Sequence, residues 1–400
     1  TCARRSAAPA AAPLAGDTPS SPVASPYMIA SRRLLSGTTF LAAFSLASGL
    51  RATPAIQRAF AGRAMAAAAS SEAASSRPAN PLGAVWQQTM LRIRDPETSV
   101  PFYENHFGLS VVDKYDFPQW SFSLYFMTTL TDEEKASWPE PGTEEAHARL
   151  WTTDKMCLEL THNHGTTLES PAPQTGNQAG FRGFGHIAFN TEDVYAACAE
   201  LEAAGARFQK KPDEGRMKGL AFVLDPDGYW IEIVRRAPGL GFPKYNLSQT
   251  MLRVNSAVDT LRFYRDLLGM SVLAERHFDA AHGDFSLYFL QHLPEGETPP
   301  DPTTPEAMEY IKTRFGPVLE LTVNNSPEDY VTGNEANDAG AAGFGHVGFL
   351  VDDLEAAFKY LDERGVTWKK RPQDGNMRQI AFAYDPTGYW VELVQKGASF

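Results

Sequence analysis

Glu232 lies in the middle of an apolar stretch, DPDGYWIEIV (Asp225–Val234), which begins with turn residues and continues as a strand of aromatic and β-branched residues. In an alternating strand this carboxylate points away from its two isoleucine neighbours. A single glutamate of this kind is usually solvated on an exposed strand face. The stretch recurs, however, as DPTGYWVELV (Asp385–Val394), with Glu392 at the same place. A recurring carboxylate between apolar residues can bind a metal ion or transfer a proton.

Further polar groups occupy matching positions along the chain. The strands that open four repeated units carry an amide or an imidazole, at Gln88, His186, Gln249 and His346. The strands that close these units carry a carboxylate between aliphatic residues, at Glu159, Glu232, Glu320 and Glu392. One Gln, one His and two Glu form an oxygen-rich set with one imidazole, which suits Zn, Ni, Co or Mn and leaves coordination positions for substrate. We therefore predict metal sites that act as Lewis acids.

An internal repeat positions these groups. QTMLR, FSLYF, LELT and GFGH each occur twice, and the two GFGH motifs begin at residues 183 and 343, which is 160 residues apart. A period of this length is that of a domain. We predict an N-terminal targeting or disordered leader over residues 1–80 and two domains over residues 81–240 and 241–400.

Each copy contains a second, weaker repeat of one strand, one helix and three strands. Asp95-Pro96 and Gly108 provide start and stop signals for the first helix, and further helices are expected near residues 192–201, 257–268 and 354–363. The predicted fold is α+β, with four βαβββ modules that each form a small curved sheet with one helix behind it. If paired modules face one another, their opening and closing strands direct the polar groups into a shared concavity.

Charge and cysteine content restrict the partners and the compartment. The net charge is −12, and residues 1–77 contain eight basic and two acidic residues, so the remaining 28 basic and 46 acidic residues have a net charge of −18. An acidic body argues against nucleic acid as the main partner. The three cysteines lack metal-site spacing and do not suggest a disulfide framework, which favours a reducing compartment.

The basic, Ala/Ser-rich leader has the composition of a transit peptide. Its apolar run, Leu34–Leu50, is short for a membrane span, which requires about 20 apolar residues. We expect import into a plastid or mitochondrion and no membrane association; a secretory signal peptide and a cytoplasmic location are the alternatives.

The combined motifs resemble those of the glyoxalase I (lactoylglutathione lyase) family, of the vicinal-oxygen-chelate superfamily, in its fused two-domain form. The motifs QTMLR, FSLYF, LELTHN, RGFGHI and DPDGYWIEI carry this resemblance, which covers nearly all of residues 85–237 and, more loosely, 245–395. It implies two tandem domains of paired βαβββ modules. It also implies isomerisation of the hemithioacetal of methylglyoxal and glutathione to S-lactoylglutathione, with glutathione as cosubstrate and a metal cofactor.

The resemblance further implies that each metal site takes residues from both copies. The first site is then formed by Gln88, Glu159, His346 and Glu392. The second site is formed by Gln249, Glu320, His186 and Glu232. In this scheme the metal polarises the substrate oxygens while Glu392 or Glu232 moves a proton between adjacent carbons.

The family motif also assigns residues to the glutathione part of the substrate. Around the first site these are Arg92, Asn163, Lys370 and Met377. Around the second site they are Arg253, Asn324, Arg182, Lys210 and Met217. Arg182 has Ala342 as its counterpart in the other copy, so we predict that the second site binds the glutathione adduct more tightly.

Two acidic insertions, Asp132–Glu145 and Glu295–Glu309, are expected to form solvated loops or short helices. In the family such longer segments accompany zinc-preferring enzymes, which favours Zn over the alternatives Ni and Co.

Duplication provides within one chain what a dimer provides between two, so we expect a monomer with internal pseudo-dimeric symmetry. An iron-dependent dioxygenase of the same fold would require a second histidine in each set. A non-catalytic metal- or ligand-binding protein of this fold is the alternative function.

Overall fold

The computed structural model describes residues 78–326, 328–334 and 342–400. This part of the chain forms four βαβββ modules, as predicted. The first contains β1 (Val85–Ile93), α3 (Pro96–Phe107), β2 (Leu109–Phe117), β3 (Phe122–Thr129) and β4 (Cys157–Asn163). The second contains β5 (Phe184–Thr191), α6 (Val194–Ala203), β6 (Arg207–Lys210), β7 (Ala221–Leu224) and β8 (Trp230–Arg235). The third contains β9 (Asn246–Arg253), α7 (Ala257–Leu261), β10 (Ser271–Phe278), β11 (Phe285–Gln291) and β12 (Val318–Asn324). The fourth contains β13 (Phe344–Val351), α9 (Leu354–Asp362), β14 (Trp368–Lys370), β15 (Ile380–Tyr384) and β16 (Trp390–Gln395).

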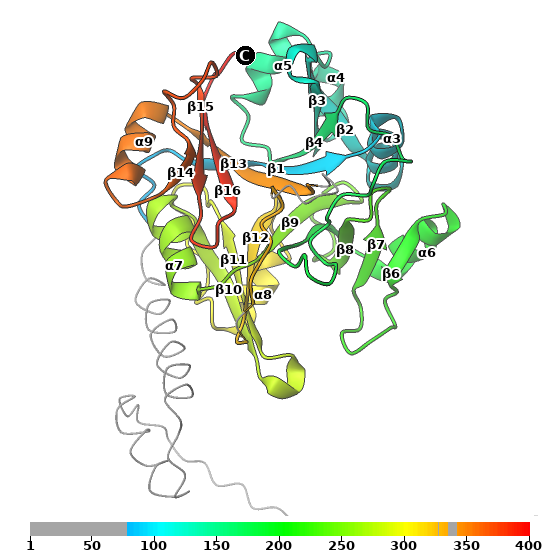
Figure 1. Ribbon diagram of the computed structural model, residues 1–400. Coiled ribbons are helices and arrows are strands. Elements are labelled where there is room, and N and C mark those ends of the chain that lie inside the picture. Colours follow the sequence, from blue (N-terminus) through cyan, green and yellow to red (C-terminus); the bar gives the residue numbers. More distant parts are fainter. Residues whose placement is uncertain (1–77, 327, 335–341) are drawn as a thin grey trace, which may run out of the picture. The chain divides into compact units, whose positions relative to one another are not determined.

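The two sheets do not coincide with the two sequence copies. One sheet has the order β14-β15-β16-β13-β1-β4-β3-β2, and the other has the order β10-β11-β12-β9-β5-β8-β7-β6. Each sheet therefore joins the first module of one copy to the second module of the other. In Figure 1 the blue to cyan strands of the first module and the orange to red strands of the fourth share one sheet. The antiparallel pairs β1–β13 and β5–β9 make these junctions.

Local sequence signals account for the helices. Asp95 caps α3, its side chain accepting a hydrogen bond from the backbone N–H of Glu97, and Gly108 ends that helix with a left-handed φ of 68°. The helix expected over residues 192–201 begins two residues later, because Asp193 is the capping residue. The helix expected over residues 257–268 is α-helical only to Leu261 and continues as a π-helical turn over Arg262–Leu267.

The acidic insertions contain short helices. The first holds α4 (Asp132–Ser137) and the start of α5 (Glu144–Leu150), and the second leads into α8 (Pro305–Ile311). Thr131 and Glu134 form a reciprocal capping box at the start of α4, which explains how so short and acidic a segment is helical.

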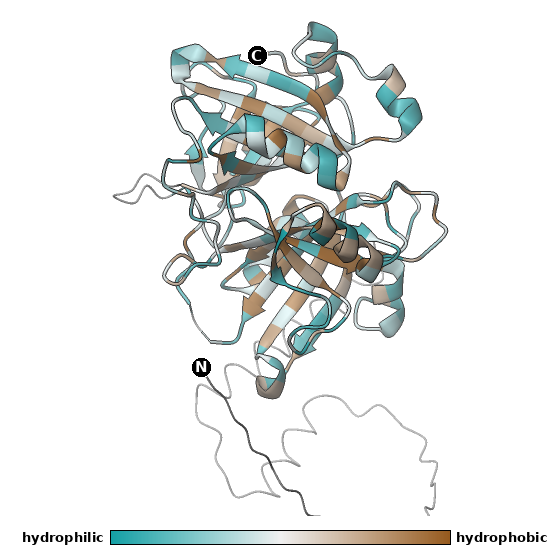
Figure 2. Cartoon of the chain, turned by 90° about the vertical axis from the view of Figure 1, so that its right-hand side faces the viewer, coloured by the Kyte–Doolittle hydropathy of each residue, from teal (hydrophilic) through white to brown (hydrophobic). Residues whose placement is uncertain are grey.

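One large hydrophobic core draws on both sheets and on the inner faces of the helices. It includes fully buried side chains from each of the four modules, among them Tyr103, Phe189, Tyr264 and Phe349. Figure 2 shows hydrophobic positions along the strands and hydrophilic ones on the loops and outer helix faces. A smaller cluster, which includes Phe126 and Ile380, brings together strands from the two ends of the first sheet. Burial of this apolar surface stabilises the arrangement of the strands that carry the polar groups.

No helix in the part of the chain that the structure describes is long and apolar enough to cross a membrane. The predicted leader over residues 1–80 lies almost entirely outside the described residues.

Candidate metal centres

The first site lies on four adjacent strands of one sheet. Gln88 on β1 has its Nε2 atom 2.8 Å from Glu159 Oε2 on β4 and 2.6 Å from Glu392 Oε2 on β16. His346 Nε2, on β13, lies 3.1 Å from Gln88 Nε2, 3.2 Å from Glu159 Oε2 and 3.1 Å from Glu392 Oε2. The strand order β16-β13-β1-β4 brings these four side chains together from sequence positions more than 300 residues apart.

The second site has the same arrangement in the other sheet. Gln249 Nε2 lies 2.7 Å from both Glu232 Oε2 and Glu320 Oε2, and 3.1 Å from His186 Nε2. His186 Nε2 lies 3.3 Å from Glu232 Oε2 and 3.5 Å from Glu320 Oε2. The structure thus groups the eight side chains in the combinations that the resemblance implies, and each group mixes residues of both copies.

These groups fit a divalent metal ion. The eight side chains belong to residues that are between 1% and 8% exposed, and two buried carboxylates beside one histidine require compensating charge. Ligand atoms bound at about 2.1 Å around one ion are separated by about 3.0–3.4 Å, close to the separations seen here. Gln88 Oε1 is buried without a hydrogen-bond partner among the described residues. Rotation of the amide by 180° directs this oxygen, instead of the nitrogen, at the centre of the group.

Backbone turns and aromatic contacts hold the closing strands and histidines in place. Asp225 Oδ1 accepts hydrogen bonds from the backbone N–H groups of Asp227, Gly228 and Tyr229, and fixes the turn before β8. Asp385 forms the same turn before β16. The rings of His186 and Phe222 meet edge to face, with 5.4 Å between their centres, as do those of His346 and Phe382. The side chains of both sites are therefore positioned by rigid elements of the fold.

Both histidines bind protons tightly when no metal is present. Burial lowers the pKa of His346, but the Glu392 and Glu159 carboxylates outweigh this effect and raise it to about 9. The pKa of His186 is raised in the same way to about 9 by Glu232 and Glu320, despite burial. Burial raises the pKa of Glu320 as well, with His186 opposing the shift. At neutral pH a metal ion must therefore displace a proton from each imidazole.

Metal uptake by the metal-free protein is accordingly expected to release about one proton per ion at pH 7. Because the histidine pKa is raised to about 9, protons compete with the metal below that pH. The apparent metal affinity should then rise about tenfold per pH unit between pH 7 and 9 and level off above pH 9. Calorimetric titrations in buffers of different ionisation enthalpy measure this release. Uptake without proton release at pH 7 would contradict the assignment of the histidines as ligands.

A close approach at Gly348 distinguishes the two sites. A Cβ atom at this position would lie 2.5 Å from Gln88 Cγ and 2.8 Å from its Cδ. In the second site the corresponding residue is Ala188, which pairs with Gln249 and Glu232. The first site therefore requires glycine for the observed placement of Gln88.

We expect Gly348→Ala to weaken metal binding at the first site by about fivefold or more, since overpacking of this kind costs about 1–3 kcal/mol. The measurement is a metal titration of the stripped protein, which should resolve one weakened and one unchanged site. Ala188→Gly is the matched control and should change neither affinity by more than about twofold. Two unchanged affinities in Gly348→Ala would show that Gln88 adjusts to an alanine as Gln249 does beside Ala188, so that glycine is not required.

Four of the cations assigned to glutathione lie within electrostatic reach of carboxylates of the sites: Arg92, Arg253, Lys210 and Lys370. Arg92 near the end of β1 and Arg253 at the end of β9 are counterparts, and each donates hydrogen bonds to backbone carbonyls. Arg92 also donates to the side chain of Asn334, and Arg253 to that of Asn177. Burial lowers the pKa of both arginines. Lys370 Nζ donates to the carbonyls of Met377 and Ile380, and Lys210 Nζ donates to that of Leu220. Each lysine thereby closes a loop beside its site.

The remaining assigned residues differ between the copies. Met377 packs against the smaller apolar cluster of the first sheet, whereas Met217 is 49% exposed. Asn163 ends β4 and is exposed, while its counterpart Asn324 ends β12 and donates to Glu328 Oε2 at 3.0 Å. The structure thus places the assigned residues at both sites in unequal surroundings.

Sequence reasoning missed several contacts. Thr161 Oγ1 donates to Glu159 Oε1 at 3.3 Å, and the hydroxyls of Thr89 and Thr250 meet at 2.7 Å between the two opening strands. All three threonines lie in the repeated QTMLR and LELT motifs, so repetition was the available signal. Glu328 was also missed, because the two copies differ around it.

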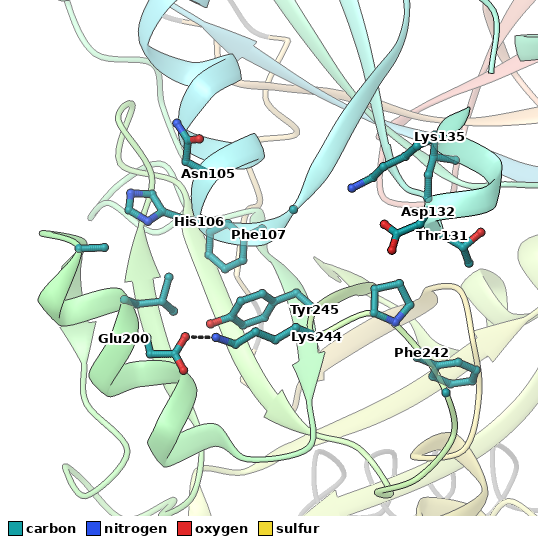
Figure 3. A pocket seen from close by; sticks show the side chains of 16 residues that line it. Asn105, His106, Phe107, Thr131, Asp132, Lys135, Glu200, Phe242, Lys244 and Tyr245 are labelled. Carbon is teal, nitrogen blue, oxygen red and sulfur yellow. Dashed lines mark hydrogen bonds and ion pairs between the residues drawn. The ribbon is translucent and has the colours of Figure 1, made fainter. Parts of the chain in front are cut away.

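A separate hollow of about 520 Å³ lies between α3, α4, α6 and the segment before β9. Figure 3 shows Lys244 and Glu200, which form an ion pair beside Tyr245 in this hollow. None of the residues that line it belongs to either metal site or to the assigned glutathione residues.

Comparison with known proteins agrees with the fold and with the duplication. The family model described as Glyoxalase/Bleomycin resistance protein/Dioxygenase superfamily matches residues 86–233 and 246–393. The sequence is 35% identical to glyoxalase I of Saccharomyces cerevisiae over 324 residues, which cover 77% of this chain and 91% of the yeast protein. It is also 35% identical to lactoylglutathione lyase of Schizosaccharomyces pombe over 317 residues, with 77% and 95% coverage. The chain therefore belongs to this superfamily and, within it, to the glyoxalase I (lactoylglutathione lyase) family.

A solved structure shows the same fold. The crystal structure of glyoxalase I from Zea mays superposes with a TM-score of 0.54 at 24% sequence identity, and the match covers 78% of this chain and 92% of the maize chain.

Proposed function

We propose that the protein is a metal-dependent lactoylglutathione lyase, which isomerises the hemithioacetal of methylglyoxal and glutathione to S-lactoylglutathione at both sites. The observation that carries this proposal is the convergence of one glutamine, one histidine and two glutamates at each of two buried positions. Membership of the glyoxalase I family supports it. A non-catalytic binding protein has no need of a complete set of these groups in both copies.

A divalent ion held by the four side chains of a site would supply Lewis acidity to the two adjacent oxygens of the substrate. Glu392 and Glu232 are suited to the proton transfer, since each lies within a rigid closing strand and its carboxylate reaches the centre of its group. The carboxylate removes the proton from the carbon that carries sulfur and returns it to the neighbouring carbonyl carbon. The hydroxyl proton passes to the former carbonyl oxygen, so the carbon that carries sulfur becomes the thioester carbonyl and its neighbour becomes the new alcohol carbon. Both glutamates are buried, which limits exchange of the proton with solvent.

The glutathione part is assigned to the arginines, lysines and asparagines at the strand ends. Arg92 and Lys370 provide cations at the first site, and Arg253, Arg182 and Lys210 at the second. These cations can bind the peptide's carboxylates, while the apolar cluster beside the first site can receive the methyl end of the substrate. We propose zinc as the metal, supported by the acidic insertions that contain α4 and α8.

The test is turnover by protein stripped with a chelator and then titrated with Zn, Ni or Co, with thioester formation followed by ultraviolet absorbance. Activity should be lost on stripping and return with metal, and the most active metal decides between Zn and its alternatives. Tight metal binding without turnover by any of these ions would support the binding-protein alternative.

We also propose that the chain acts as a monomer and that its leader directs import into a plastid or mitochondrion. The two sites formed within one chain support the first proposal, and the basic, acid-poor composition of residues 1–77 supports the second. Sedimentation of the purified protein tests the first. Imaging of a fluorescent fusion with and without residues 1–80 tests the second, since deletion should leave the fusion in the cytoplasm.

A further inference from the structure

A carboxylate of the protein itself occupies two of the groups assigned to glutathione at the second site. Glu328 Oε1 accepts a hydrogen bond from Arg182 Nη1, with which it forms an ion pair. Glu328 Oε2 accepts a hydrogen bond from Asn324 Nδ2 at 3.0 Å. One carboxylate therefore bridges a guanidinium and an amide in the way that a bound substrate carboxylate would.

The backbone holds this carboxylate in place. Asn324 ends β12, and Arg182 lies two residues before β5. The N–H group of Val331 donates to the carbonyl of Arg182 at 2.8 Å, so the segment that follows Glu328 runs beside Arg182. Arg182 and Glu328 both act on the pKa of Arg253, which burial lowers; Arg182 lowers it further and Glu328 opposes this shift. The three charged groups thus lie within electrostatic reach of one another.

The first site lacks both members of this pair. The loops of the two copies can be aligned at the equivalent glycines of the GFGH motifs, Gly183 and Gly343. Gly183 lies against the carbonyl of Val331, since a Cβ atom there would meet that carbonyl, and Gly343 lies in the same way against the carbonyl of Gln174. Gln174 is therefore the counterpart of Val331. Three residues before Gln174 stands Pro171, where the other copy has Glu328. Ala342 stands where the other copy has Arg182. The arginine and the glutamate are therefore present together at one site and absent together at the other.

We propose that Glu328 is an internal competitor for a substrate carboxylate at the second site and thereby sets the affinity of that site for glutathione adducts. This inference rests on the proposed function. Arg182 and Asn324 must transfer their hydrogen bonds from Glu328 to the substrate before the substrate gains from them. The prediction that Arg182 makes the second site the tighter one treated this arginine as free, whereas the structure gives it an intramolecular partner.

The size of the effect of Glu328 on affinity follows from the solvent exposure of its ion pair with Arg182. The side chains of Arg182 and Glu328 are 43% and 29% exposed, so water and salt screen their attraction. Measured exposed pairs correspond to factors of about 1.4–5 in an equilibrium constant. Glu328 therefore lowers affinity without closing the site, and its effect should diminish as ionic strength rises.

The test uses full-length, metal-loaded protein in which one site is silenced. In a Glu392→Gln background only the second site should turn over, and adding Glu328→Gln should lower its KM for the hemithioacetal by about two- to fivefold with kcat unchanged. In a Glu232→Gln background, where only the first site is active, Glu328→Gln should change neither constant. S-methylglutathione binding, measured by calorimetry on the Glu392→Gln proteins, should strengthen by the same factor.

An unchanged or higher KM on adding Glu328→Gln to the Glu392→Gln background would overturn the proposal. An equal change in the Glu232→Gln background would also overturn it, because the effect would then not be local to the second site. If the Glu392→Gln parent fails to isomerise the hemithioacetal, the proposed function of the second site fails, whereas S-methylglutathione binding still decides the role of Glu328.

Discussion

The double variant Glu159→Ala/Glu232→Ala is expected to lose nearly all activity, whereas Glu159→Ala/Glu392→Ala retains on the order of half. The first pair comes from one sequence copy but removes a ligand from each of the two sites. The second pair comes from two copies but removes both carboxylate ligands from the first site only. Loss of the ligand Glu159 at the first site and of the ligand and base Glu232 at the second should lower kcat by about 10²–10⁴-fold.

The two variants are matched controls, because each replaces two buried glutamates by alanine. Turnover with saturating metal is the measurement, and circular dichroism checks that both proteins fold. The reverse ranking, with more activity in Glu159→Ala/Glu232→Ala, would mean that each site is formed within one copy.

Glu232→Gln combined with Glu392→Gln is expected to lower kcat by about 10²–10⁴-fold while the protein still binds two metal ions per chain. The amide oxygen of glutamine can replace a carboxylate oxygen as a ligand but cannot accept and return a proton. The measurements are turnover and metal content by elemental analysis after dialysis.

The control for this variant is Glu133→Gln/Glu306→Gln, which makes the same changes at two exposed glutamates and should leave kcat unchanged. Normal kcat in Glu232→Gln/Glu392→Gln would exclude these residues as the proton carriers. A loss of turnover in proportion to a loss of bound metal would limit them to a role as ligands.

Much of the fold could be predicted because its signals are local and occur four times. The signals at Asp95, Gly108 and Asp225 each involve only a few neighbouring residues. In the structure Asp95 and Gly108 cap the first helix and Asp225 begins a turn, as their sequence context predicts. The π-helical turn after Leu261 was not predicted, since the apolar spacing of an α-helix and of a π-helical turn differ by a single residue.

The pairing of modules could not be derived from the repeat alone. The modules of one copy have matching ligand positions, so the sequence is equally consistent with each site forming within a copy or between copies. The antiparallel pairs β1–β13 and β5–β9 decide between these arrangements, and they join strands that lie far apart in the sequence. Resemblance to a family provided this information before the structure did.

The surroundings of the glutathione residues were the least predictable part. Asn163 and Asn324 share a motif, but the following loops differ in length, with 11 residues before Thr175 and 7 before Thr332. Glu328 therefore has no matching glutamate in the other copy, and the repeat gives no signal for it. Side-chain pairing across a loop depends on three-dimensional proximity that a repeat does not encode.

The central claim is that each metal ion is held by side chains from both copies, and the most direct test is X-ray anomalous scattering at the zinc edge from crystals of the zinc-loaded protein. The account predicts one peak at about 2.0–2.2 Å from ligand atoms of Gln88, Glu159, His346 and Glu392. It predicts a second peak at the same distances from ligand atoms of Gln249, Glu320, His186 and Glu232. Zinc held only by residues of a single copy, or no zinc at these groups, would contradict it.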